Sequence, residues 1–585
     1  MYLYHACRLS FIVSLSAGLM ACAVFQSDTV SKNPVAVPAQ LYATPIEAQE
    51  TTETAQQSSS SSLPDAALMK QLQAVDDELN AGEYETAQQQ LTQLTPLLKT
   101  NPTLQTNLII LQTKLALLAG NPARAVSWLN QLSPELYLNA SQQHYVMQLR
   151  IQALYRTNQI LLSAIANIED NSDTTIIWDE LLTIDPDTLQ AQQTAHSQPV
   201  ITGWLQLAQI AQRNANNFNA LKNNLTEWQK NHPQHPAISL LSTMNNVTQD
   251  KNNTSAIAVI LPLSGGYASL GQKVQKGVLA AHYASTNTLK QRVTFYDSNA
   301  ESIAAIYQRI QANGDALILG PLTKEDTEEL LNIAQETPKI ISLNYTSINS
   351  PNSHLEFGLS PEDEAKQTAQ LAWRQGKSQA IIIAPKTEKG EQTANAFIET
   401  WRTLGGQVVD QYNYANNDNF SKSISTLLGV TDSKWRQHLV HSALQLRIAS
   451  TPYFRKDADM VFLIADPQIA RQIGPFIKFY SGNYFSVFAT SSVYESANNP
   501  NVNKDLNDIY FCDMPAILKK TRGEHERLYF LGADAYLLAM QQPHLNTLPR
   551  FPIIGATGKL TIDATHDIQR ELLCAQFKNG HPIPL

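Results

Sequence analysis

The hydrophobic rhythm of the chain changes near residue 255, and this change restricts the fold more than any other feature. From Asp65 to about Val247, apolar residues recur at spacings of three and four without convincing alternating runs, which predicts amphipathic helices. From Ser255 onward, short β-branched runs alternate with helical stretches. This alternation predicts parallel sheets in a doubly wound α/β arrangement. We therefore expect a helical domain over residues 65–247 and an α/β domain over residues 255–585.

A weak repeat with an offset of 38 residues runs through the helical region. Its copies read Gly82, Ala87 and Leu91, then Gly120, Ala125 and Leu129, then, in degenerate form, Asn158, Ser163 and Asn167. A Gly or Asn ends one helix in a left-handed conformation, and the small Ala or Ser lets the next helix pack closely. The pattern resembles tetratricopeptide-like helical hairpins, whose period is about 34 residues. The alternative is an ordinary helical bundle with chance similarity.

The α/β region contains enough strands for two sheets. Nine strand-like runs cover residues 256–263, 292–297, 316–320, 339–344, 355–360, 379–385, 407–414, 460–466 and 485–490. The break between two lobes falls near a helix that Ser360 caps, with Pro361 at its first position and Gly376 at its end. Such a helix commonly follows the first crossing between two lobes.

The first 64 residues predict an export signal and a tether. The apolar run from Leu9 to Leu19 is shorter than the roughly 20 residues that span a bilayer, so it predicts a signal peptide over residues 1–21. The stretch from Leu19 to Cys22 resembles a bacterial lipobox, which implies lipidation of Cys22. An ordinary signal peptide with an incidental cysteine is the alternative. Residues 22–64 are rich in Ser, Thr, Gln and Pro and predict a flexible tether.

Few residues suggest further chemistry. Cys512 and Cys574 could form a disulfide in an oxidising compartment or remain as two separate buried thiols, and the sequence leaves this open. Gly266 and Gly271 begin a phosphate-binding pattern, but Gln272 stands where its lysine belongs. The formal net charge of -9 disfavours nucleic acid as a partner. We expect no catalysis, no cofactor and no metal.

Several motifs point to a family. The stretch from Ile260 to Tyr283 resembles the first strand, loop and helix of type I periplasmic binding proteins. More specific stretches are Gly358 to Trp373, Asp457 to Tyr480, Asp505 to Pro515 and Gly555 to Asp563. With the lipobox and the helical region, they resemble the outer-membrane lipoproteins that activate penicillin-binding proteins. The resemblance implies a tetratricopeptide-like helical domain followed by a two-lobed domain like the type I periplasmic binding proteins.

The same resemblance implies where the protein acts and on what. The partner would be a class A penicillin-binding protein of the 1A type, a bifunctional transglycosylase and transpeptidase that makes peptidoglycan. The lipid anchor would hold the chain on the periplasmic side of the outer membrane, because Ala23 is not the Asp that retains lipoproteins in the inner membrane. Helical repeats form concave surfaces that suit proteins and polymers, so peptidoglycan is a further candidate partner.

A periplasmic solute receptor of the amino-acid-binding type is the alternative function. Its ligand would lie between the lobes, at the carboxyl ends of parallel strands. The candidate lining residues are Ser264, Tyr267, Thr323, Asn344 and Tyr345. The same residue types also cap helices and form turns, so we expect no tight binding of a common amino acid.

The segment from Ser433 to Asp457 looks like an insertion beyond a minimal lobe. It carries side chains of the kinds that contribute most energy at protein interfaces, namely Trp435, Arg436, Arg447, Tyr453, Phe454 and Arg455. We expect these residues to form the partner-binding surface. The alternative is an ordinary pair of helices that packs Trp435 and Phe454 into the lobe.

Overall fold

The computed structural model describes residues 64–98, 101–132, 138, 140–246, 256–285, 291–335, 338–346, 354–445, 451–495, 499–519, 526–563 and 567–585. The predicted signal peptide, Cys22, the tether up to residue 63 and Arg447 lie outside the described residues. None of the described helices combines the length and the apolar character that crossing a membrane requires.

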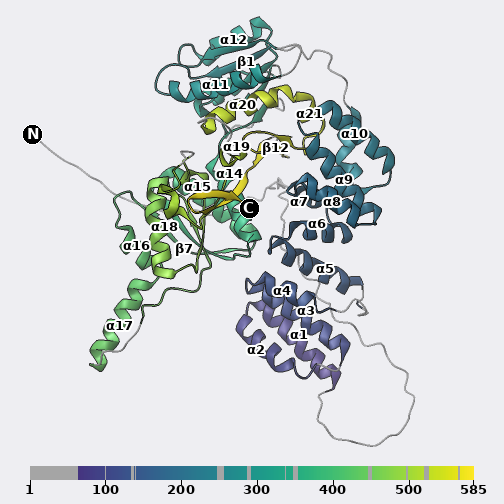
Figure 1. The fold of residues 1–585 in the computed structure, drawn as a ribbon, viewed down its shortest axis with the longest axis vertical. Helices are drawn as coiled ribbons and strands as arrows, with labels where there is room; N and C mark the ends of the chain where they lie inside the picture. The colour runs from purple at the N-terminus through teal and green to yellow at the C-terminus, as the bar shows by residue number, and fades with distance from the viewer. Residues whose placement is uncertain are drawn as a thin grey trace, which may run out of the picture. The chain divides into compact units, whose positions relative to one another are not determined.

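Helices form the amino-terminal part (Figure 1). They are α1 (Asp65–Ala81), α2 (Tyr84–Leu94), α3 (Pro102–Leu118), α4 (Pro122–Leu129), α5 (Ala140–Tyr155), α6 (Ile160–Glu169), α7 (Thr174–Leu182), α8 (Pro186–Ala195), α9 (Pro199–Arg213), α10 (Phe218–Asn231) and the 3-10 helix η1 (Pro236–Asn246). Gly82, Gly120 and Asn158 have left-handed φ values of 84°, 71° and 57°. Ala87 and Ala125 are fully buried. The predicted helix ends and close helix contacts of the repeat are therefore confirmed.

The degenerate third copy of the repeat has a physical reason. Ser163 donates a hydrogen bond to Glu180 at 3.1 Å, and Asn167 donates one at 3.0 Å. All three side chains are buried, and burial raises the pKa of Glu180 against the effect of these hydrogen bonds. Polar residues replace the usual Ala and Leu here because a buried carboxyl group needs partners.

Lobe 1 contains a five-stranded parallel sheet in the order β2-β1-β3-β4-β5. Its elements are β1 (Ile257–Leu261), α11 (Ala268–Ala284), β2 (Val293–Asp297), α12 (Ile303–Asn313), β3 (Leu317–Leu319), α13 (Lys324–Ile333), β4 (Lys339–Ser342) and β5 (His354–Glu356), and α20 (Arg527–Met540) joins its core much later in the chain. α11 and α20 touch through glycines, because a Cβ on Gly277 would lie 1.9 Å from the Tyr529 carbonyl oxygen.

Lobe 2 contains a seven-stranded sheet in the order β15-β14-β10-β9-β8-β6-β7. Its elements are α14 (Pro361–Arg374), β6 (Gln379–Pro385), α15 (Glu388–Thr403), β7 (Gln407–Tyr414), α16 (Phe420–Leu427), α17 (Val430–Leu444), β8 (Met460–Leu463), α18 (Pro467–Ser481), β9 (Ser486–Ala489), the 3-10 helices η2 (Ser491–Val493) and η3 (Val502–Leu506), β10 (Tyr510–Asp513), α19 (Pro515–Leu518), β14 (Leu573–Lys578) and β15 (His581–Pro584). The last two strands run antiparallel to their neighbours. All nine predicted strand-like runs overlap a strand of these two sheets.

The sequence predicted two sheets, but the described residues form three. After α21 (Gln542–Thr547), strands β11 (Ile553–Ile554), β12 (Lys559–Ile562) and β13 (Ile568–Glu571) form a third, antiparallel sheet. These strands have only two to four residues. None of them lies within the nine predicted runs.

The helical region shares a hydrophobic core with the segment after α21. Leu548 and Phe551 belong to the cluster formed by helices α6 to α10 and η1. The rings of Trp178 and Phe551 lie 4.8 Å apart, and the Trp178 indole nitrogen donates to the Arg550 carbonyl oxygen at 3.0 Å. Removing the helical region would therefore expose apolar side chains of the α/β region.

Candidate functional site: the hinge and the arm

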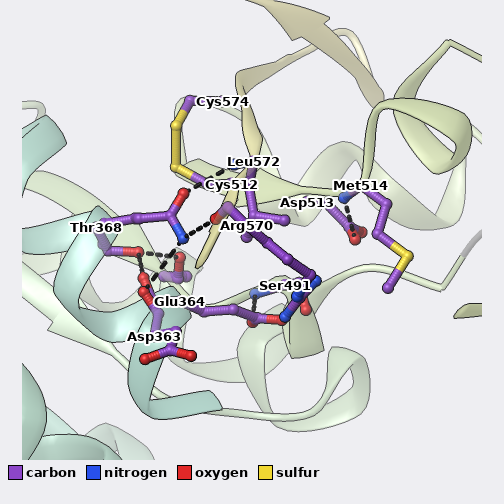
Figure 2. The surroundings of a disulfide bond; sticks show 12 residues. Asp363, Glu364, Thr368, Ser491, Cys512, Asp513, Met514, Arg570, Leu572 and Cys574 are labelled. Carbon is purple, nitrogen blue, oxygen red and sulfur yellow. Dashed lines mark hydrogen bonds between the residues drawn. A yellow bond between two sulfur atoms is a disulfide. The ribbon is translucent and has the colours of Figure 1, made fainter. Parts of the chain in front are cut away.

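The chain passes between the lobes three times. The first crossing joins β5 to α14, the second joins α19 to α20, and the third joins β13 to β14. Several polar side chains lie near these crossings around a disulfide, and Figure 2 labels Glu364, Asp513 and Arg570 among them. We call them the hinge cluster: Glu364, Gln367, Cys512, Asp513, Arg527, Arg570 and Cys574.

Gln367 connects the first crossing to the third. Its side-chain nitrogen donates to the Arg570 carbonyl oxygen at 2.8 Å, and its side-chain oxygen accepts from the Leu572 backbone nitrogen at 2.8 Å. One side chain on α14 thus satisfies two backbone groups of the strand that returns to lobe 2. An apolar residue at this position would leave both groups without these partners.

A disulfide joins two neighbouring strands of the lobe 2 sheet beside the crossings. Cys512 on β10 and Cys574 on β14 face each other as a cross-strand pair, and their sulfur atoms are bonded at 2.05 Å. Cys512 is 1% exposed. The pairing that the sequence left open is therefore present in the structure.

An ion pair fixes the start of α20 to lobe 2. Arg527 donates through Nε and Nη2 to both carboxylate oxygens of Asp513, at 3.0 and 2.5 Å, and Nη2 also donates to the Ser491 and Tyr494 carbonyl oxygens at 3.1 Å each. Burial alone would lower the pKa of Arg527, but the charge of Asp513 and the hydrogen bonds to it, with the charge of Glu364, raise it. The guanidinium therefore remains charged.

Glu364 and Arg570 complete the cluster. Glu364 accepts a hydrogen bond from the Ser491 backbone nitrogen at 3.0 Å, and burial raises its pKa, with a further contribution from the charge of Asp513. Arg570 is only 6% exposed, and its Nε and Nη1 have no hydrogen-bond partner among the described residues. The Arg570 charge acts on Glu364 and opposes the rise of its pKa. Two arginines and two acidic residues thus lie close together, with Asp513 and Arg570 buried and Glu364 and Arg527 partly exposed.

The residues predicted to line the interlobe cleft follow neighbouring strands of lobe 1. Ser264 and Tyr267 come after β1, Thr323 after β3, and Asn344 and Tyr345 after β4. Thr323 caps α13 by accepting from the Asp326 backbone nitrogen at 3.2 Å.

Asn344 and Tyr345 also make contacts within the protein. Asn344 donates to the Leu322 carbonyl oxygen at 3.1 Å. Tyr345 interacts with Asp363 and with the Gly358 backbone at the first crossing, and its pKa is raised, mainly by burial. These contacts are the caps and turns that the sequence offered as the alternative to a ligand. Within the described ranges, no group of three potential metal ligands was found.

The predicted partner-binding residues divide between an exposed helix and its base. Figure 1 shows α17 extending away from the other elements of lobe 2. Trp435 is 62% exposed and Tyr453 is 60% exposed, whereas Phe454 packs against the core of lobe 2. Arg436 is also exposed. The structure therefore brings Phe454 into the lobe and leaves Trp435 in solvent.

The base of α17 is fixed by charged side chains. Arg455 donates to Asp410 at 2.7 Å and to Asp457 at 2.8 Å. The hydrogen bond to Asp457 is the main cause of a raised pKa of Arg455. Lys456 lies 3.6 Å from the ring centre of Phe454 and 3.7 Å from that of Tyr484. Arg455 thus has a structural role at the base.

Comparisons with known proteins give the family. The penicillin-binding protein activator LpoA of Yersinia pseudotuberculosis serotype O:1b (strain IP 31758) is 29% identical, over 71% of this chain and 74% of that protein. The protein of the same name from Edwardsiella ictaluri (strain 93-146) is 27% identical, over 99% of this chain and 98% of that protein.

Among solved structures, the C-domain of LpoA from Haemophilus influenzae, described as a regulator of PBP1A, matches with 25% identity. It covers 57% of this chain and 100% of that chain, with a TM-score of 0.44. The model of the family described as LppC putative lipoprotein matches residues 45–580. Because this match spans most of the sequence, the chain belongs to the LppC putative lipoprotein family.

Proposed function

We propose that this protein binds and activates a class A penicillin-binding protein of the 1A type, and that it regulates peptidoglycan synthesis without catalysing a reaction itself. The proposal is supported by membership of the lipoprotein family and by relatives, aligned over most of their length, that are named activators of penicillin-binding proteins. None of the recognised catalytic motifs was found in the sequence.

The hinge cluster favours this function over that of a solute receptor. A receptor that closes over its ligand must change the backbone angles of its crossing segments. In this protein the two hydrogen bonds of Gln367 hold the third crossing to α14 of lobe 2, and the Arg527–Asp513 ion pair holds the start of α20 to β10 of lobe 2. These contacts oppose independent bending of the crossings and suit a domain that presents a fixed surface to a partner.

The decisive assay measures peptide cross-linking by a purified class A penicillin-binding protein with and without the full chain lacking residues 1–21. We expect the cross-linking rate to rise as the chain is added, and the chain alone to form no cross-links. An unchanged rate at saturating chain would reject the activator function. Micromolar binding of leucine in a calorimetric titration, about 8 kcal/mol, would instead favour the receptor.

We further propose that Cys22 is lipidated and anchors the chain to the outer membrane, with residues 22–64 as the tether. At about 3.3–3.6 Å per extended residue, a segment of this length reaches on the order of 140 Å. The helical region over 65–247 and the α/β region over 255–585 would then stand well clear of the membrane. Cys22→Ser should release a folded chain from outer-membrane fractions, and retention there would reject the anchor.

A further inference from the structure

We propose that the arm, which comprises α17 and residues 451–457, docks into an apolar groove with an acidic rim on the penicillin-binding protein. This inference rests on the proposed function and names the surface that would perform it.

Most large apolar side chains of the arm helix α17 are exposed and do not pack against lobe 2. Only Val430 and Ser433 of α17 are buried. Its large apolar side chains are instead exposed, at 62% for Trp435, 48% for Leu439, 46% for Val440 and 53% for Leu444. Exposed aromatic and aliphatic side chains grouped on one element are a mark of interaction sites.

The base of the arm holds its exposed surface in place. The Tyr453 backbone nitrogen donates to the Ser433 side chain at 2.8 Å and connects the returning segment to α17. The ion pairs of Arg455 with Asp410 and Asp457 fix the same segment to lobe 2. A surface that is ordered before binding loses less conformational entropy when the partner docks.

The order of side chains around α17 favours a protein over a membrane as the occupant. At about 100° per residue, Trp435 and Leu439 lie on one side of Arg436, and Val440 and Leu444 lie on the other. A helix that lies in a membrane surface keeps its charged residues on the opposite face. Arg436 would enter the lipid with its apolar neighbours, whereas a protein groove can offer it a carboxylate.

The charge of the arm indicates what kind of groove it fits. The residues of α17 together with residues 451–457 include four Lys or Arg residues and two Asp residues, whereas the whole chain has a formal net charge of -9. Two arms packed against each other would bring their cations together, which opposes self-association through this surface. An apolar groove would accept the exposed apolar side chains of the arm, and an acidic rim would complement its positive charge.

The test uses the full chain without residues 1–21, immobilised and titrated with a purified class A penicillin-binding protein. We expect Leu439→Glu and Arg436→Glu each to raise the Kd at least tenfold, because one puts a charge into the apolar contact and the other reverses the central cation. The control is Phe479→Ala on α18, because Phe479 is 79% exposed on the same lobe. We expect this control to change the Kd less than twofold.

The outcomes separate this inference from the proposed function. If the unmodified chain neither binds nor activates the penicillin-binding protein (the synthase), the proposed function fails. If it does both and the two arm variants match the control, only the docking inference is overturned. It is also overturned if the arm variants lose binding to vesicles of phosphatidylglycerol, or lose self-association in sedimentation, while their affinity for the synthase is unchanged.

Discussion

The hinge cluster and the arm use arginine in opposite ways within one domain. Arg527 is 29% exposed, but its guanidinium contacts a carboxylate that is only 1% exposed. Arg455, at the base of the arm, contacts two carboxylates that are 44% and 56% exposed. A buried pair strongly opposes the loss of one partner, whereas an exposed pair contributes little because water and salt screen it. The hinge cluster should therefore determine stability, and the arm should determine binding.

The largest expected effect is the loss of the buried ion pair. Arg527→Met should lower the free energy of unfolding by about 4 kcal/mol, because it leaves the Asp513 carboxylate buried without its countercharge. The matched variant Arg455→Met should cost no more than about 1 kcal/mol. Urea unfolding followed by circular dichroism measures both. If both variants lost the same free energy of unfolding, the proposed difference in stability between the hinge cluster and the arm would be wrong.

Removal of the disulfide should have the next largest effect. Cys512 and Cys574 are 62 residues apart, and replacing both with Ala should lower the free energy of unfolding by about 3 kcal/mol, because the unfolded chain gains freedom. The same urea titration measures this loss. Mass analysis of unreduced protein provides the check, since two free thiols would contradict the bond.

Gln367→Leu should cost about 2 kcal/mol, because the Arg570 carbonyl and the Leu572 backbone N–H each lose a buried partner. Gln392→Leu is the matched control, since Gln392 donates only to Glu388 one turn earlier on an exposed helix face. Its unfolding free energy should stay within about 0.5 kcal/mol of that of the unmodified chain. A loss as large as that of Gln367→Leu would show that the position at the crossings does not matter.

Acidic pH should weaken lobe 1 near the first crossing. His354 on β5 is buried beside the Ser342 hydroxyl at 2.9 Å, and burial lowers its pKa to about 4. The unfolded chain binds the proton at a higher pH, so the stability from neutral His354 is present above about pH 6.5 and is lost as the pH falls toward 4.

His354→Gln tests this titration. Between pH 7 and pH 5 the variant should lose roughly 1–2 kcal/mol less stability than the unmodified chain. Urea titrations of both proteins at the two pH values measure the difference. Parallel losses would assign the pH dependence to other groups.

The smallest expected effect is that of an arm substitution on stability. Trp435→Ala should change the free energy of unfolding by less than about 0.5 kcal/mol, because most of this side chain is already in water. Thermal unfolding of the variant and of the unmodified chain measures the change. A loss of several kcal/mol would mean that Trp435 packs against the protein in solution, and the arm would then resemble the hinge cluster.

The helices and most strands could be predicted because their apolar residues recur at regular spacings along the sequence. The nine strand-like runs each overlap a strand, and Ser360 accepts from the Asp363 backbone nitrogen at 3.0 Å as its capping role requires. The third sheet was missed, as were β10, β14 and β15, because these strands lie outside the nine runs; the stretch from Gly555 to Asp563, which contains β12, was identified only as a family motif.

The hinge cluster could not be predicted from periodicity. Gln367 and Glu364 read as ordinary polar positions of an amphipathic helix, and their partners are more than 120 residues away in the sequence. Such long-range hydrogen bonds leave no local pattern. The sequence held one clue to this cluster, because a disulfide between Cys512 and Cys574 would have placed Asp513, the neighbour of Cys512, close to Cys574. A pair of cysteines alone, however, does not establish that they are bonded.

The glycine contact between α11 and α20 has a consequence for biosynthesis. The sheet of lobe 1 is complete in the sequence at Glu356, yet α20 begins only at Arg527. Lobe 2 in turn receives its last two strands after Leu573. A chain that is still emerging, or is cut before residue 540, thus leaves the glycine-bearing face of α11 in water and lobe 2 with an unpaired edge at β10. Both lobes are therefore completed only by the last part of the chain, and unfinished chains carry exposed surfaces of the kind that chaperones and proteases recognise.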